Sequence, residues 1–232
     1  MIEQFAINID NIEKVEGIKN IKHILSKEKA DKIERFHFEK DKIRGIVGEA
    51  LVRYLLIEKY NINKSDIKFG YSEKGKPYLV SSDCGIYFNI SHAGSWVVCG
   101  IGDSKVGIDI ELIKDKEIRF ANYVLATQEY NNWLSLPDNE KRDYFYQLWT
   151  IKESYSKYLG IGLALQFTDV LVDSLGNDYY SINNEGDCAL FSQKFNEDYY
   201  LSICANKDKK EDIISQVTYV NINDIIKTLF ST

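Results

Sequence analysis

The chain has 232 residues, enough for one large domain or two of roughly 110 residues each. Its 44% hydrophobic and 28% charged residues are typical of a globular protein, and two prolines argue against long disordered linkers. The net charge of −6 disfavours a nonspecific nucleic-acid binder, although a local basic pocket remains compatible with it. No apolar run reaches the ~18 residues of a membrane span. Acidic residues near the N-terminus argue against a secretion signal, so we expect a cytoplasmic protein.

The four cysteines, Cys84, Cys99, Cys188 and Cys204, are widely spaced and include no Cys-x-x-Cys pair. This spacing does not match a zinc site, and a cytoplasmic protein keeps its thiols reduced. We expect all four cysteines to be reduced residues of the core.

The first elements are a strand and two helices. Phe5 to Ile9 alternates as a strand does, and Ser26 is placed to cap a charged helix that runs to Phe38. Lys29 and Lys32 lie three apart in that helix and therefore share a face. A second helix is predicted over residues 41–60, where apolar side chains recur at helical spacing and leave Arg44 free to point elsewhere.

The middle of the chain changes to short alternating runs, which predict an antiparallel sheet. The runs are Ile67 to Tyr71, Ile86 to Ile90, Trp96 to Ile101 and Val106 to Leu112. Residues 72–77 contain Gly75 and Pro77 and form a predicted turn whose lysines face solvent or an anion.

The rest of the chain repeats the order of helices followed by strands. Helices are predicted over residues 127–136 and 141–159, and a short one over 223–230. The intervening strands lie near Val170, Tyr180, Leu190, Tyr200 and Val217. This order predicts an α+β protein with two halves that meet near residue 105.

Acidic residues in two segments of the second half are placed to form one site. Gly107-Ile108-Asp109-Ile110-Glu111 alternates like a strand, so Asp109 and Glu111 project from one face. In the later helix, Glu153 and Lys157 lie four apart and share a face. Three carboxylates suit Mg²⁺, although without Glu153 a solvated strand face is the commoner interpretation of Asp109 and Glu111.

These segments resemble motifs of the Sfp-type 4′-phosphopantetheinyl transferases. Residues 107–111 are similar to the G-[IV]-D-[IV]-E motif, and Trp149 to Lys157 is similar to W-x-x-K-E-[AS]-x-x-K. Phe88 to His92 resembles F-N-[IVL]-S-H, and Gly75-Lys76-Pro77 resembles the G-K-P loop. The four occur in the family's order.

The resemblance implies an α+β fold of two similar halves in a pseudo-twofold arrangement. Residues 1–105 would form the N-terminal half, which clamps the nucleotide of coenzyme A. Residues 106–232 would form the C-terminal half, which supplies the metal-binding and catalytic carboxylates. A chain of this length is expected to be a monomer.

Members of this family move the phosphopantetheine arm of coenzyme A onto a serine of an apo carrier protein and release adenosine 3′,5′-bisphosphate. By resemblance, Asp109, Glu111 and Glu153 would hold Mg²⁺ against the pyrophosphate. Glu153 would also be the base, acting directly or through a metal-bound water, and Lys157 would steady the departing phosphate. The partner would be a peptidyl, polyketide or fatty acid acyl carrier protein, with no role for nucleic acid or membrane.

The resemblance also assigns a nucleotide clamp to the first half. The phosphate-binding members would be Lys29, Lys32, Arg44, Lys76 and His92, and Pro77 and Ser91 would shape the adenine and phosphate walls. Gly45 departs from relatives that have a hydroxyl residue there, so one phosphate contact is expected to be missing. Carrier docking would fall within residues 118–133, with Phe120, Tyr123 and Leu125 as candidate anchors.

Two other functions are compatible with the same residues. Three carboxylates beside a basic pocket could orient water at a phosphodiester, as in a metal-dependent phosphohydrolase or nuclease. A noncatalytic module that binds nucleotide or carrier protein would keep the fold with a vestigial metal site. The intact Glu153 and Lys157 favour the transferase over such a module.

Overall fold

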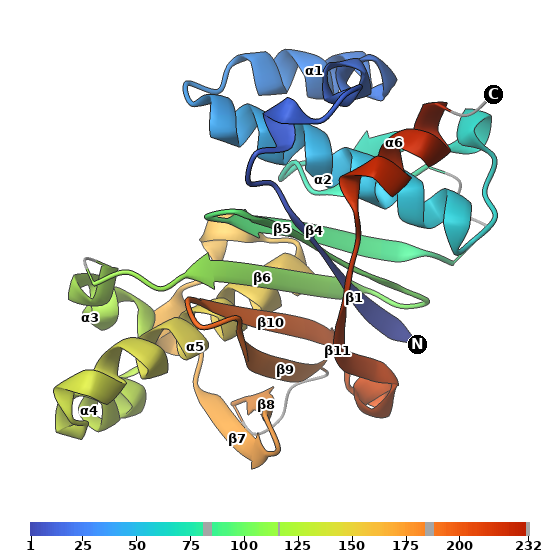
Figure 1. The fold of residues 1–232 in the computed structure, drawn as a ribbon. Helices are drawn as coiled ribbons and strands as arrows, with labels where there is room; N and C mark the ends of the chain where they lie inside the picture. The colour runs from blue at the N-terminus through green and yellow to red at the C-terminus, as the bar shows by residue number, and fades with distance from the viewer. Residues whose placement is uncertain (81–84, 116, 184–187, 231–232) are drawn as a thin grey trace.

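The computed structural model describes residues 1–80, 85–115, 117–183 and 188–230. Two sheets lie one above the other in Figure 1. The first has the order β11-β1-β5-β4 and consists of β1 (Ile2–Asn8), β4 (Tyr87–Ala93), β5 (Trp96–Gly102) and β11 (Ile213–Tyr219). The second has the order β6-β10-β9-β8-β7 and consists of β6 (Val106–Leu112), β7 (Val172–Gly176), β8 (Tyr179–Ile182), β9 (Cys188–Phe195) and β10 (Tyr199–Asn206). A small hairpin pairs β2 (Phe69–Tyr71) with β3 (Pro77–Leu79).

Helices cover both sheets, which confirms the predicted α+β class. The helices above the first sheet are α1 (Lys27–Glu34), α2 (Glu39–Glu58) and α6 (Ile222–Phe230). Those beside the second sheet are α3 (Ala121–Val124), α4 (Thr127–Ser135) and α5 (Asp138–Leu159). Short 3₁₀ helices occupy Ile12–Lys14, Ile18–Ile24, Lys64–Asp66, Glu117–Phe120, Gly162–Ala164, Phe167–Asp169 and Lys207–Asp212.

The predicted start of the first helix is confirmed, but its end is not. The Ser26 hydroxyl accepts a hydrogen bond from the Lys29 amide at 3.2 Å, as an N-cap does. The helix ends at Glu34 rather than at Phe38. Phe38 has extended backbone angles and is the N-cap residue that precedes α2.

The prediction of one antiparallel sheet across residues 67–112 is wrong. β6 pairs with β10 rather than with β5, and β2 pairs with β3 outside both large sheets. Alternation identifies which side chains of a strand are buried, but it does not identify the neighbouring strand. Ile108 and Ile110 are instead buried with Leu201 and Ile203 of β10.

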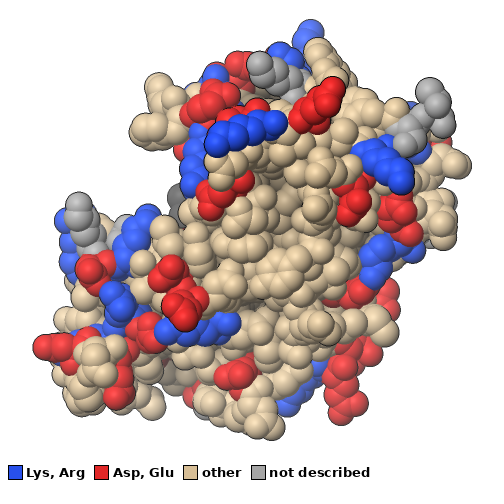
Figure 2. Space-filling model, viewed as in Figure 1, with Lys and Arg blue, Asp and Glu red and all other residues tan. Residues whose placement is uncertain are grey.

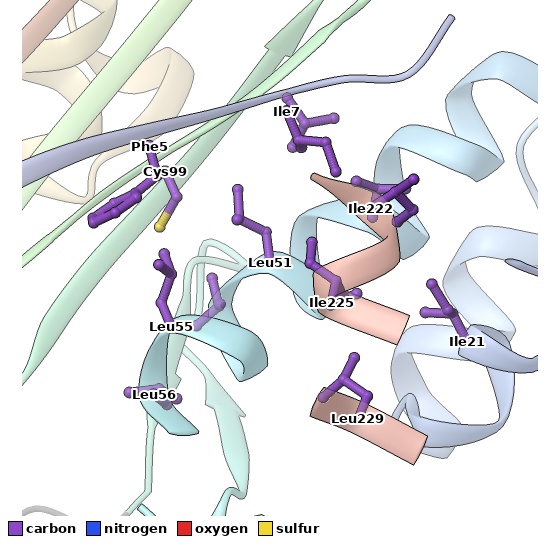
Figure 3. Close-up of a cluster of buried hydrophobic side chains, with 14 of the residues drawn as sticks. Phe5, Ile7, Ile21, Leu51, Leu55, Leu56, Cys99, Ile222, Ile225 and Leu229 are labelled. Atoms are coloured by element: carbon purple, nitrogen blue, oxygen red, sulfur yellow. The ribbon is translucent and has the colours of Figure 1, made fainter. Parts of the chain in front are cut away.

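The end of the chain returns to the first half. β11 pairs in parallel with β1, and α6 buries Ile225 and Leu229 against Leu51 and Leu55 of α2 (Figure 3). The predicted division at residue 105 therefore needs correction at the C-terminus, because residues 213–230 pack with the N-terminal half. The strong apolar face of α6 is buried only in that position.

On the face drawn in Figure 2, acidic and basic side chains are interspersed around the rim of an uncharged centre. Among the described helices, none combines the length and the apolar character that a bilayer crossing needs. Cys99, Cys188 and Cys204 are buried and reduced, as predicted, and Cys84 lies outside the described residues.

Candidate functional site

The site lies at the seam where the edge strands of the two sheets, β4 and β6, run beside each other. Asn89 of β4 is 5% exposed, and its side-chain oxygen accepts a hydrogen bond from the Ile108 amide of β6 at 2.9 Å. This bond replaces a strand-to-strand bond where the sheet is interrupted. Sequence reasoning assigned Asn89 no role, although its place in a buried strand was a signal that the side chain has a partner.

Three predicted residues from distant segments meet at this seam. The Ser91 hydroxyl donates to Asp109 Oδ1 at 2.9 Å, and Lys157 Nζ lies 2.6 Å from the same oxygen. Lys157 also donates to Ser91 Oγ at 2.8 Å. Because β4, β6 and α5 each contribute one residue, the tertiary fold assembles this cluster.

Three carboxylates at the seam, those of Asp109, Glu111 and Glu153, are in surroundings that disfavour their negative charge. Burial raises the pKa of Asp109, although Lys157 and Ser91 act in the opposite direction. Burial and then the Asp109 charge raise the pKa of Glu111 to about 8. The same two causes raise the pKa of Glu153, and the charge of Lys157 and then a hydrogen bond from Trp149 oppose them. Such a group favours any cation that enters it.

The donor chemistry of this group fits Mg²⁺. Asp109 Oδ2 is buried and has no hydrogen-bond partner, so one hard oxygen is free to coordinate an ion. Within the described part of the chain, however, no set of three His, Cys, Asp or Glu side chains is gathered closely enough to hold a metal as the side chains stand. The residues thus fit the ion by charge and oxygen type, although they do not stand as a closed set of ligands.

Gly107 allows α5 to approach this close to β6. A Cβ at Gly107 would lie 2.1 Å from the Ser154 carbonyl oxygen and 2.4 Å from the Tyr158 amide nitrogen. Both are backbone atoms, so only glycine fits between the strand and the helix. The close approach places Glu153 and Lys157 over the strand that carries Asp109.

The lysines of the turn were predicted to face solvent or an anion, but Lys76 turns inward to two backbone carbonyl oxygens. Its Nζ donates to the carbonyl oxygens of Val106 at 3.0 Å and Lys157 at 2.5 Å. It therefore links the turn of the first half to both the strand and the helix of the second half. Burial, followed by the charge of Lys105, lowers the pKa of Lys76 from 10.5 to about 8.

This lowered pKa predicts a pH dependence of stability. Native Lys76 releases its proton at lower pH than the unfolded chain does, so the free energy of unfolding should rise with pH between about 8 and 10.5. Lys76→Met keeps the apolar stem and removes the titration. We expect the difference in urea midpoint, wild type minus variant, to increase across this window; a constant difference would contradict the prediction.

The other predicted cations lie along the first half of the seam. Arg44 donates to Asp41 Oδ1 at 2.6 Å and to the Gly94 carbonyl. Partial desolvation and then the Arg44 charge lower the pKa of His92, which is an exposed residue of β4. These residues form one group at the hairpin between β4 and β5.

Lys29 and Lys32 lie near the turn of residues 72–77. Burial lowers the pKa of Lys29, opposed by the charge of Glu49. Lys32 Nζ lies 3.8 Å from the position a Cβ would take on Gly75. The helix that carries them packs closely on α2 at Gly45, where a Cβ would lie 3.1 Å from Ile33. A hydroxyl side chain at position 45 would therefore meet Ile33.

A cavity of about 510 Å³ opens beside Lys76 and Pro77. Its walls come from both halves and include Tyr87, Phe88, Val106 and Leu159. Because these walls are mainly apolar and lie next to a lysine, the cavity suits a flat organic group with attached negative charge.

The predicted docking segment is only partly accessible. Phe120 is 42% and Tyr123 69% exposed, so both are available to a partner. Leu125 is 2% exposed and packs in the core, so its prediction as an anchor is wrong. An apolar residue at a short helix can face either the core or the solvent, and the tertiary packing determines which of the two Leu125 faces.

Comparison with known proteins covers both halves of the chain. Residues 105–204 match the model of the 4′-phosphopantetheinyl transferase superfamily, and residues 14–101 match that of the 4′-phosphopantetheinyl transferase N-terminal region. A crystal structure of a holo-(acyl-carrier-protein) synthase from Bacillus anthracis aligns with 44% of this chain and 95% of its own, at 20% identity and a TM-score of 0.38.

Two relatives match over most of their length. The 4′-phosphopantetheinyl transferase Sfp of Bacillus subtilis is 33% identical over 198 residues, which cover 84% of this chain and 88% of the relative. The 4′-phosphopantetheinyl transferase gsp of Aneurinibacillus migulanus is 33% identical over 227 residues, which cover 97% and 92%. The motifs that meet at the seam lie within the matched regions, and the chain belongs to the 4′-phosphopantetheinyl transferase superfamily.

Proposed function

We propose that this protein transfers the 4′-phosphopantetheine arm of coenzyme A to a serine of an apo acyl or peptidyl carrier protein, acting as a monomer. The observation that carries the proposal is the contact of Ser91, Asp109 and Lys157 at the seam, together with membership of the family. A phosphate held between two halves is accessible to a nucleophile that a second protein brings.

The first half is proposed to bind the nucleotide end of coenzyme A. Its phosphates would lie among the positively charged Lys29, Lys32, Arg44 and Lys76 and the imidazole of His92, which lie near the turn and the β4–β5 hairpin. Its adenine would use the apolar wall of the cavity beside Pro77. Charge-assisted hydrogen bonds of this kind are stronger than neutral ones and hold the pyrophosphate at the seam.

The second half is proposed to perform the proton transfer. The carrier serine oxygen forms a bond to the phosphorus that bears pantetheine, the bond from that phosphorus to the bridging oxygen breaks, and adenosine 3′,5′-bisphosphate leaves. Glu153 accepts the serine proton, because its raised pKa makes it a better base than an exposed glutamate. Lys157 places its ammonium beside the departing phosphate. Asp109, Glu111 and Glu153 would hold Mg²⁺, which neutralises charge on the phosphates when bound.

Intact-mass spectrometry tests this function directly. We expect an apo peptidyl carrier domain or a fatty acid acyl carrier protein to gain one phosphopantetheine arm after incubation with this protein, coenzyme A and Mg²⁺. A gain on both carriers would indicate a broad transferase, and a gain on one would identify the carrier class. Coenzyme A consumed without any gain would indicate the phosphohydrolase, and neither change on several carriers would contradict the proposal.

A further inference from the structure

The residue before Glu153 has a separate, fully buried set of contacts. Lys152 is 0% exposed and extends away from the seam, toward the segments around α3 and α4. Its Nζ donates to the carbonyl oxygen of Val124 at 2.8 Å, to Glu129 Oε2 at 2.5 Å and to the carbonyl oxygen of Phe167 at 3.0 Å. An ammonium has three protons, so all the donors of Lys152 are used.

The partner carboxylate of Lys152 is equally buried and equally engaged. Glu129 is 2% exposed. Besides Lys152, its two oxygens accept hydrogen bonds from the amides of Ala126 and Val172, each at 2.8 Å. The pair thus binds backbone groups at four positions, namely Val124, Ala126, Phe167 and Val172.

Such a pair is poorly explained by stability alone. Removing two charges from water costs free energy, and an apolar pair of similar volume is often as stable or more stable. An apolar pair could not bind the four backbone groups, however. α3 has four residues and α4 nine, so neither helix is long enough to be stable without contacts to the rest of the protein. The Lys152–Glu129 pair is therefore a buried polar link between α5 and the α3–α4 corner (residues 121–135), in addition to the apolar packing there and the hydrogen bond from Trp133 to the Lys141 carbonyl oxygen.

This corner is continuous with the candidate site. β6 leads past Glu111 into the corner, which lies beyond the end of that strand in Figure 1. It exposes Phe120 and Tyr123 on the outside, while Ala121 and Val124 are buried in an apolar cluster that also contains Phe145 of α5. This exposed surface lies beyond the end of the strand that carries Asp109 and Glu111, so a macromolecule that approaches the site from that end of β6 would meet it.

We propose that Lys152 and Glu129 are positioning residues, which hold the Phe120–Tyr123 surface at a fixed place relative to Glu153 for the carrier protein. The inference rests on the proposed transfer function and deepens it. Neither residue touches coenzyme A or the reacting atoms, so their effect should appear in the interaction with the carrier.

The test uses the double variant Lys152→Met, Glu129→Leu, which removes both charges and keeps apolar volume. We expect the KM for the apo carrier to rise about tenfold, equivalent to 1.4 kcal/mol, with unchanged coenzyme A affinity by calorimetry and a smaller change in kcat. A matched control is Asp143→Asn, Lys194→Met, which removes a partly exposed ion pair of α5. That control should leave the carrier KM unchanged.

A second variant, Glu129→Asp, keeps the charge and withdraws the carboxylate by one methylene, so it should fold where the double variant fails. We expect faster hydrogen exchange at the Ala126 and Val172 amides and an intermediate rise in carrier KM. A folded variant with wild-type carrier KM would overturn the inference while leaving the transferase intact. Absence of transfer by the wild-type protein would instead overturn the proposed function, and this inference with it.

Discussion

The Glu153→Gln variant should lose transfer activity by about 10²–10⁴-fold, the usual contribution of a positioned general base. Gln has nearly the same shape but accepts no proton from the carrier serine. Glu153 is also the third carboxylate of the charged group at the seam, so the substitution additionally weakens its attraction for a cation. Coenzyme A affinity should remain largely intact, because the proposed nucleotide contacts come from the first half.

Single-turnover transfer to an apo carrier, followed by mass spectrometry, measures the first effect, and calorimetry with coenzyme A measures the second. Glu140→Gln provides a control, since Glu140 is an exposed glutamate of the same helix. We expect normal transfer by this control. Near-normal turnover of Glu153→Gln would remove Glu153 from the role of base.

The Gly107→Ala variant should be strongly destabilised and inactive. The added Cβ would overlap two backbone atoms of α5, at 2.1 and 2.4 Å, and neither can move without the helix. We expect a loss of about 3 kcal/mol in the free energy of unfolding, the upper part of the range for overpacked cores. Any protein that still folds would hold Glu153 and Lys157 away from Asp109.

Urea unfolding and transfer assays check this prediction, with Gly45→Ala as the matched control. Gly45 is buried in α2, and its added Cβ would meet only side-chain atoms, the nearest at 3.1 Å on Ile33. Alanine is also the better helix former, so the two effects should nearly cancel. Equal stability losses in the two variants would show that backbone overlap at Gly107 is not the cause.

Local structure was largely predictable because it depends on patterns within one segment. The strand at Val106–Leu112 and the helix over Glu39–Glu58 follow from alternation and from helical spacing. The neighbours of these elements were not predictable in the same way. The pairing of β6 with β10 and the return of residues 213–230 to the first half depend on apolar faces that match across the whole chain.

The same distinction between local pattern and tertiary packing applies to the site. Sequence alone determined the residue types, and three carboxylates and a lysine at these spacings suit phosphate chemistry. The family was identified by the resemblance of four ordered motifs to those of known members. Only the tertiary structure decided that Ser91 and Lys157 share Asp109, that Lys76 turns inward to two carbonyl oxygens, and that Leu125 is buried. It also decided that Lys152 and Glu153, neighbours in the chain, have different surroundings: Lys152 binds Glu129 and two carbonyl oxygens, and Glu153 lies at the seam. Spacing determines which side chains share a face of one element, but what each face contacts depends on how the elements pack.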